Sequence, residues 1–407
     1  MGTAALGRPC RAKLGGKRQL VDPERFVPSN ALMVYSRSRA LALLLLSLLL
    51  LRAQAASNHT TTDWEVHPSL KFDTLCALNV LSGDPYYLEY YRADYDRLSK
   101  QLKPEELTAL ANLKRRIKDQ NGGIISAQLA LYFSAVDAET IPKMIKVVDD
   151  SRALKHNLEA TPYYDEQQWK VYDASRPDLK AALQALERIH FETDWKQTAS
   201  PALDKTRGDI IAELPRYNIV PVIEAKLGKA LPSNRIMVYL LYYSEPHGIK
   251  ITGTRFLTHY SYPFRIVLRN AIHEMMHPPY DLAHDAELRN DLDSLRGDPF
   301  LMNKVEQHDP SFGYNTLDGL VEEDSVQALE EVIAEHFGAG HDSRAYWREQ
   351  DGGIHVFAVA LFSLMQEQHF AEGTEPFPAF LKRMLREGKF AKGEIERRNQ
   401  AFFAVKP

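Results

Sequence analysis

Apolar residues recur at helical spacing along most of the chain. Between residues 84 and about 190 the pattern is helical almost throughout, and apolar positions three or four residues apart predict one buried face per helix. One such set is Leu129, Tyr132, Phe133 and Val136. Helical patterns resume in five later segments, at about 284–305, 319–338, 353–369, 376–388 and 393–404.

A pattern typical of β-strands occurs in one part of the chain. Residues 235–243 are rich in β-branched and aromatic side chains, and residues 249–257 alternate between apolar and polar positions. Pro246 and Gly248 indicate a loop between these two strands, and a helix is predicted directly after them, over 263–277. We therefore expect an α+β fold, mainly α, in which an N-terminal helical bundle precedes a region with a small β-sheet.

The N-terminal part of the chain contains a long uncharged run instead of an amphipathic pattern. Residues 40–51, ALALLLLSLLLL, are uncharged throughout, but 12 residues are fewer than the roughly 20 of a membrane-spanning helix. Basic residues before this run and a small-x-small site ending at Ala55 are typical of a secretory signal peptide, which we expect over 33–55. Met33 is then the natural start, and residues 1–32 are a non-native or unstructured extension. These features predict an exported protein, secreted or periplasmic, without a stable membrane anchor after cleavage.

Charge and cysteine content exclude several classes of function. The full chain has 50 basic and 54 acidic side chains, and loss of the first 55 residues would lower the net charge from −4 to −11. An acidic protein of this kind is unsuited to nucleic acid, because phosphate binding needs clustered positive charge. The two cysteines, Cys10 and Cys76, exclude a disulfide-rich scaffold and a four-cysteine zinc module.

The motif that carries chemistry lies in the predicted helix 263–277, where residues 273–277 read HEMMH. The spacing of four residues places the imidazoles of His273 and His277 on one helix face, one turn apart, where both can bind Zn²⁺. Glu274 lies beside the metal and can accept a proton from water bound there. Because two prolines follow His277 directly, the helix must end or bend at that residue.

These features resemble those of the gluzincin class of zinc metallopeptidases, in which two histidines, a distant glutamate and a water complete a tetrahedral zinc site. The three-histidine metzincin pattern is absent. The layout is also similar to a poorly characterised family of exported, mostly bacterial, zincin-like proteins. The short motif of that family, Glu-x-x-aliphatic-x-Ala-aliphatic, corresponds to Glu323-Asp-Ser-Val326-Gln-Ala328-Leu329. The resemblance over residues 65–390 is weak, and only the two short motifs are specific.

With this resemblance the mature chain divides into three predicted parts. They are a helical N-terminal domain over 56–190, a zincin-like metal-binding domain over 191–345, and a C-terminal helical region over 346–407. Residues 56–72, at the start of the first part, are polar and form either a linker or an extended entry strand.

Three glutamates compete for the role of third zinc ligand. The short family motif favours Glu323, whereas Glu331 fits the Glu-x-x-x-acid run of thermolysin-like enzymes, with Glu335 as its outer partner. At about 100° per residue, the apolar stripe of the helix at 319–338 leaves Glu331 on the opposite, solvated face. Glu323 lies on the flank of that stripe and Glu322 inside it. We therefore expect His273, His277 and Glu323 to bind zinc, with Glu331 and then Glu322 as alternatives.

Further candidates are possible hydrogen-bond donors. His355 ends the stretch Asp-Gly-Gly-Ile-His, which resembles the segment that carries a transition-state histidine in thermolysin-like enzymes, where an imidazolium stabilises an oxyanion. The alternative is a histidine at a helix start without a catalytic role. Tyr260 and Tyr262, just before the predicted helix, are donor candidates as well, with core packing as the alternative.

The sequence therefore predicts an exported zinc metallopeptidase that hydrolyses peptide or protein substrates. Glu274 would act as the general base and later as the proton donor to the leaving amine. The strand at 249–257 would pair with an extended peptide, as sheet edges readily do. Two other functions stay open: an exported helical binding protein with a structural or vestigial zinc site, and a zinc hydrolase of non-peptide substrates.

Overall fold

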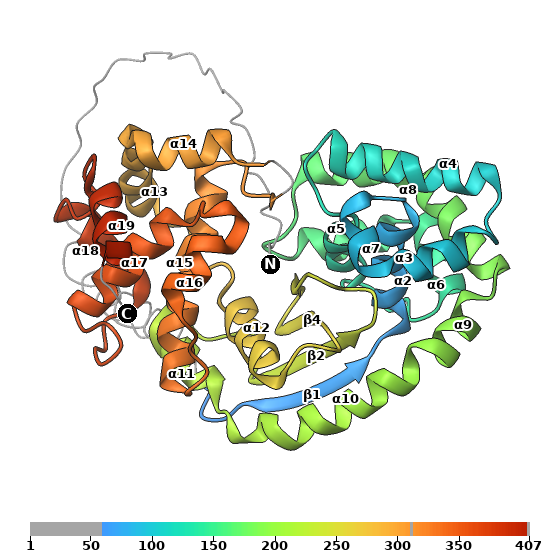
Figure 1. Ribbon diagram of the computed structural model, residues 1–407, viewed down its shortest axis with the longest axis horizontal. Helices are drawn as coiled ribbons and strands as arrows, with labels where there is room; N and C mark the ends of the chain where they lie inside the picture. The colour runs from blue at the N-terminus through green and yellow to red at the C-terminus, as the bar shows by residue number, and fades with distance from the viewer. Residues whose placement is uncertain (1–58, 310–311, 405–407) are drawn as a thin grey trace, which may run out of the picture.

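The computed structural model describes residues 59–309 and 312–404. Within these ranges the fold is α+β and mainly α, as predicted, with helices on either side of one small sheet (Figure 1). The predicted extension and signal peptide at 1–55 lie outside the described residues. No helix in the described part of the chain combines the length and the apolar character needed to cross a membrane.

The sheet has four strands in the order β1-β2-β4-β3. β1 (Asp63–Pro68) pairs in parallel with β2 (Arg235–Leu241), which pairs in parallel with β4 (Arg255–His259). The short β3 (Ile249–Ile251) runs antiparallel to β4 and forms an edge. The segment 56–72 thus contains a strand, and the sheet combines residues from the first and second predicted parts of the chain.

A hairpin replaces the single strand predicted over 249–257. Residues 252–254 form the turn between β3 and β4, and Gly253 has a φ of +73°, which glycine adopts without strain. The hydroxyl of Ser134, after α5, lies 2.9 Å from Thr252 Oγ1 and holds this turn in place. The sequence pattern is misleading here because both arms of a hairpin keep the same period of two.

One group of helices lies beyond the carboxyl end of β1, on the right in Figure 1. Polar caps start several of these helices, as at Ser69, whose hydroxyl accepts the N–H of Phe72. The members are α2 (Leu70–Leu81), α3 (Pro85–Ser99), α4 (Pro104–Lys114), the π-helical turn η1 (Arg115–Asp119), α5 (Ile125–Phe133), α6 (Ile141–Asp149), α7 (Arg152–Glu159), α8 (Glu166–Arg188) and α9 (Phe191–Thr198).

The other helices follow α9, and α10 packs along β1. They are α10 (Ser200–Glu213), η2 (Leu214–Arg216), α11 (Ile219–Leu227), α12 (Phe264–Met276), α13 (Ala286–Asp293), η3 (Ser294–Gly297), α14 (Pro299–Gln307), α15 (Leu317–His336), α16 (Ser343–Glu349), η5 (Gln350–Gly352), α17 (Val356–Glu367), α18 (Phe377–Arg386) and α19 (Glu394–Ala404). Each of the five helical segments predicted after residue 284 therefore contains a helix.

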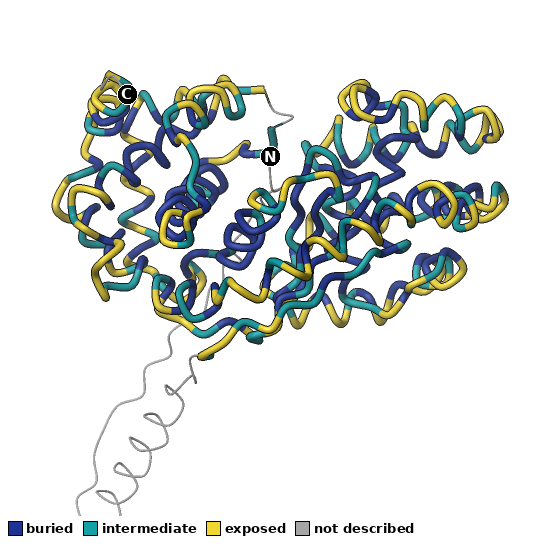
Figure 2. The backbone as a smooth tube through the Cα atoms, turned by 60° about the horizontal axis from the view of Figure 1, so that its bottom comes forward, coloured by how far each residue is buried: buried dark blue, intermediate teal, exposed yellow. Residues whose placement is uncertain are grey.

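Two helices at the centre of the molecule position the candidate site. α12 follows β4 and packs against α15, which also packs against α17. Buried segments gather inside both helical groups and between them, while exposed segments lie outside (Figure 2). Almost every residue of α15 is buried, including four that are acidic: Glu323, Asp324, Glu330 and Glu331. Acids buried at such positions need partners, and those partners define the site.

Candidate metal centre

The HEMMH motif lies at the end of α12. His273 is in the last turn, and His277 is the first residue beyond the helix, with an extended backbone (φ −75°, ψ 132°). This confirms that the helix ends at His277, where the following proline disfavours a helical conformation. The apolar residues around the histidines, Ala271, Ile272, Met275 and Met276, are buried.

The two histidines and Glu323 converge on one point. The Nε2 atoms of His273 and His277 are 3.1 Å apart, and each lies 3.6 Å from a carboxylate oxygen of Glu323. Ligand atoms at 2.0–2.2 Å from a tetrahedral zinc ion lie about 3.3–3.6 Å from one another. The three donors therefore have nearly the spacing that zinc requires. No other group of three such side chains converges in this way among the described residues.

The opposite ring nitrogens of both histidines face glutamates. Glu330 Oε2 lies 2.9 Å from His273 Nδ1, and its other oxygen lies 2.6 Å from the Arg269 guanidinium. A carboxylate on Nδ1 fixes the tautomer so that Nε2 faces the metal position, a common arrangement in zinc sites. Glu322 Oε1 lies 3.5 Å from His277 Nδ1. The sequence analysis missed Glu330 and Arg269 as outer partners.

Charge around His273 is unusually concentrated. Burial alone lowers the pKa of His273, but Glu323 and Glu330 outweigh burial and raise it to about 9. Burial likewise opposes ionisation of Glu330, yet Arg269 and His273 hold the pKa of this carboxyl below its usual range. The carboxylates around His273 thus favour a positive charge at this position, as a divalent cation would supply.

The alternative ligand Glu331 lies elsewhere. Its carboxylate is fully buried, 2.9 Å from the Arg269 guanidinium, and accepts the N–H of His341 at 3.2 Å. The prediction that Glu331 faces solvent is wrong, because α15 is buried on all sides and has no solvated face at this position. Glu322, predicted inside the apolar stripe, has a side chain that is 38% exposed.

Glu274 carries an oxygen without a partner in the described structure. The residue is 2% exposed, and its Oε2 accepts no hydrogen bond from any described residue. Burial raises the pKa of Glu274, while His273, His277 and Lys250 act against that rise. A buried carboxylate oxygen left without a donor is rare in folded proteins and fits a group that acts on a bound water.

A tyrosine from the first helical group reaches the same region. Tyr163 lies between α7 and α8, and burial, followed by the carboxylates of Glu274 and Glu322, raises its pKa to about 12. Its phenol is therefore protonated near neutral pH and is a donor that the sequence did not indicate. Tyr260 and Tyr262 lie before the start of α12, and Tyr260 stacks on another tyrosine ring. Core packing accounts for both of these residues.

His355 occupies a separate buried cluster at the start of α17. Its Nδ1 lies 2.6 Å from Asp324 and its Nε2 3.0 Å from Asp351, and its side chain is fully buried. Burial alone lowers the pKa of His355, but these carboxylates outweigh it and raise the pKa to about 9. Gln327 links His355 to the candidate ligands, since its Nε2 lies 3.2 Å from His355 Nε2 and 3.1 Å from Glu323. This geometry favours a positioning role for His355 over contact with substrate.

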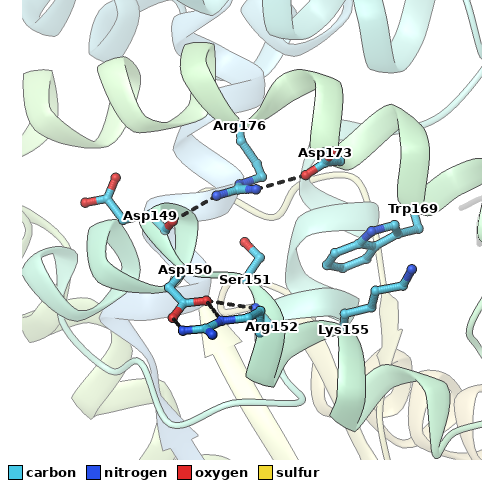
Figure 3. Close-up of a pocket in the computed structure, with 8 residues that line it drawn as sticks. All are labelled: Asp149, Asp150, Ser151, Arg152, Lys155, Trp169, Asp173 and Arg176. Carbon is cyan, nitrogen blue, oxygen red and sulfur yellow. Dashed lines mark hydrogen bonds and ion pairs between the residues drawn. The ribbon is translucent and has the colours of Figure 1, made fainter.

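A pocket within the first helical group, between α6, α7 and α8, has no such chemistry (Figure 3). Each charged side chain that lines it has an ion-pair partner. Arg152 pairs with Asp150 and Arg176 with Asp173 inside the pocket, whereas Lys155 and Asp149 pair with residues beside it. The residues that line it are Asp149, Asp150, Ser151, Arg152, Lys155, Trp169, Asp173 and Arg176. None of them belongs to the candidate metal centre.

Comparison with known proteins gives this chain no relative. A scan against protein-family models, a search of curated proteins and a search of solved structures each found no match. The geometry of the centre itself is therefore the basis for assigning a function.

Proposed function

We propose that this protein is a zinc-dependent metallopeptidase of gluzincin type, exported by the N-terminal signal peptide. The observation that carries the proposal is the spacing of 3.1, 3.6 and 3.6 Å among the two imidazoles and the Glu323 carboxylate. Histidine nitrogens and a carboxylate are the donor set of catalytic zinc sites that keep one position open. A bound zinc ion supplies a Lewis acid that polarises a carbonyl and lowers the pKa of a coordinated water.

The protein's own residues then have distinct tasks. Glu274 accepts a proton from the attacking water and returns it to the leaving amine, as its unpartnered, buried oxygen allows. Glu330 and Arg269 keep His273 in the required tautomer. Tyr163, whose pKa is raised by burial and by the carboxylates of Glu274 and Glu322, would donate a hydrogen bond to the carbonyl oxygen as negative charge develops on it.

A peptide substrate fits the sheet beside the centre. β3 is an edge strand, and outside its pairing with β4 no backbone hydrogen bond of Ile249, Lys250 or Ile251 is formed within the described ranges. An extended peptide can add to such an edge through its main chain. This would bring a peptide bond alongside α12, because β3 also packs against that helix.

Metal content and a single substitution test the proposal. Purified protein should hold about one zinc per chain and cleave a mixed peptide library, and a chelator should stop the cleavage. Glu274→Gln keeps the shape of the side chain and removes the base, so hydrolysis should fall by about 10²–10⁴-fold. Its zinc content and melting temperature should stay near those of the wild type.

Two outcomes would overturn this proposal. A wild-type protein that holds zinc and cleaves no peptide is a binding protein or acts on another substrate. A Glu274→Gln variant as active as its parent would exclude Glu274 as the base. Export is tested separately by N-terminal sequencing of the mature protein, which should begin at Ala56, and retention of residues 40–51 would contradict it.

A further inference from the structure

A lysine on the edge strand lies on the same side as the proposed base. Gly248 directly precedes β3 and Lys250 is the central residue of that strand, and positions two residues apart along a strand face the same way. A Cβ atom at Gly248 would lie 3.2 Å from Glu274 Oε1, which identifies this face as the one toward Glu274. In agreement, the Lys250 ammonium lies 3.8 Å from the sulfur of Met275, the residue after Glu274.

The partners of this ammonium leave much of its charge unmatched. It donates a hydrogen bond of 2.8 Å to the carbonyl of Gly253 and a long one of 3.8 Å to the sulfur of Met275, and neither acceptor is charged. Lys250 forms no ion pair within residues 59–309 and 312–404, whereas the ammonium groups of Lys71 and Lys118 each meet a carboxylate. Burial lowers the pKa of Lys250 to about 7, against the opposing effect of Glu274. The residue is only partly buried, so a ligand can reach its ammonium, and a carboxylate bound there would favour the charged form that burial disfavours.

A substrate carboxylate would supply the missing counter-charge. A peptide strand added to β3 would place alternate side chains on the face of Lys250, with directly opposite Cβ atoms about 4.5–5.5 Å apart. Glu323, Glu330 and Glu322 face the histidines of the candidate centre. Glu274 acts on Lys250 only through space, and the two form no ion pair among the described residues. We propose that Lys250 binds a carboxylate of the substrate beside the scissile bond, and that the enzyme selects peptides with an acidic residue or a free C-terminus there. This inference rests on the proposed peptidase function.

Matched peptides test the selectivity. Cleavage rates (kcat/KM) are compared for peptides that carry Asp or Asn, or Glu or Gln, at each position around the cleaved bond, and for free and amidated C-termini. The wild type should favour the carboxylate by about 10- to 100-fold, the range expected for a charged hydrogen bond. Lys250→Met should remove the preference, Lys250→Arg should keep it, and Lys250→Glu should shift it toward lysine-containing peptides.

Controls separate binding from folding and from net charge. Zinc content and melting temperature show whether each variant is folded and loaded. Lys170→Met removes one exposed positive charge on α8 and should leave the preference unchanged. If the cleavage rate differs only between the Asp and Asn or the Glu and Gln peptides, the ligand is an acidic side chain. If it differs only between free and amidated C-termini, the ligand is the α-carboxylate.

The inference fails if the wild type cleaves acidic and amide peptides equally, or if Lys250→Met keeps the preference. If the wild type cleaves no peptide at all, the proposed peptidase function fails first. In that case, titration calorimetry tests whether Lys250 binds a carboxylate. The same peptide pairs, with acetylated N-termini, are titrated into zinc-loaded protein. Carboxylate-dependent binding that Lys250→Met loses would support an anion site, and equal binding of both members of each pair would exclude it.

Discussion

Two adjacent residues of α15 enter two histidine clusters of opposite character. Glu323 faces the Nε2 atoms of His273 and His277, which converge at 3.1 Å, whereas Asp324 lies 2.6 Å from His355, whose other nitrogen faces Asp351. Both clusters are buried and combine imidazole with carboxylate. In the first, one nitrogen of each ring is directed at a shared point, and in the second both nitrogens are taken by acids. Ring nitrogens that converge on one point, rather than residue composition, distinguish the candidate metal centre from the second cluster.

Loss of a ligand should have the largest effect. His273→Ala or His277→Ala should weaken zinc binding by more than about 100-fold. A loss of about 100-fold is the most that is expected when only a residue holding a ligand in place is removed. His355→Ala should still hold about one zinc per chain. Elemental analysis and competition with a chromophoric chelator measure both.

The glutamates of α15 refine this test. Glu323→Ala should lower zinc affinity more than Glu331→Ala, because the Glu331 carboxylate binds Arg269 instead of facing the histidines. The reverse ranking would support the thermolysin-like alignment, and full zinc occupancy in both histidine variants would make the motif a chance match.

The second cluster should matter to stability instead. His355→Ala leaves the buried Asp324 without its cationic partner, so the free energy of unfolding should fall by about 3–5 kcal/mol. Urea unfolding of the zinc-loaded protein measures this. The exposed pair of His284 and Asp281 is a matched control, and His284→Ala should cost about 1 kcal/mol or less. Equal effects at the two sites would contradict the distinction.

Stability should also depend on pH through His355. Its pKa rises from an ordinary value near 6.5 to about 9 in the folded protein. A raised pKa stabilises the fold below about pH 6.5, and this stabilisation is lost as the pH rises toward 9. The difference in unfolding free energy between the zinc-loaded wild type and His355→Gln should therefore shrink by about 3 kcal/mol over that interval. Urea unfolding at several pH values measures it, and a constant difference would show that His355 is not charged.

Gln327 connects the two clusters, and its substitution should have an intermediate effect on zinc affinity. Its amide orientation is set by the Trp347 indole N–H, which donates to Oε1 at 2.9 Å, so Nε2 donates to Glu323. Gln327→Met removes that donor and should weaken zinc binding by about 10- to 100-fold. Trp347→Phe should act in the same direction. Unchanged affinity in both variants would mean that Glu323 holds its position unaided.

The smallest effect is expected at Gly248. An alanine there would place its Cβ 3.2 Å from Glu274 Oε1 and 3.3 Å from Asn270 Nδ2, so both side chains must shift by a few tenths of an ångström. Peptide hydrolysis should fall by about tenfold at constant zinc content, since small displacements of a catalytic group are costly. Gly208→Ala, which meets open space, is the control. A fully active Gly248→Ala would show that Glu274 tolerates displacement.

Local spacing was enough to predict part of this centre. The motif and the end of α12 follow from residues that are close in sequence, and so does the helical character of most of the chain. Helical periodicity could also have identified the outer partners of His273. Arg269 precedes His273 by one helical turn and Glu330 follows Glu323 by two turns, so each lies on the same helix face as a candidate ligand. The burial of Glu331 was not accessible in this way, since helix phase assumes one solvated face and α15 has partners on all sides. The position of Lys250 depends on a hairpin that the alternating pattern concealed.

The pairing of β1 with β2 has a consequence for how the chain reaches this fold. Asp63 pairs with Arg235, so about 170 residues, including α2–α10, must be made before β1 finds its neighbour. Closing a loop of that length costs about 4–5 kcal/mol in chain entropy. Contacts this distant in sequence slow folding, and an unpaired strand is prone to pair with another chain meanwhile. Of the four strands, β1 therefore waits longest for its neighbour, and it is the segment where we expect premature association during synthesis.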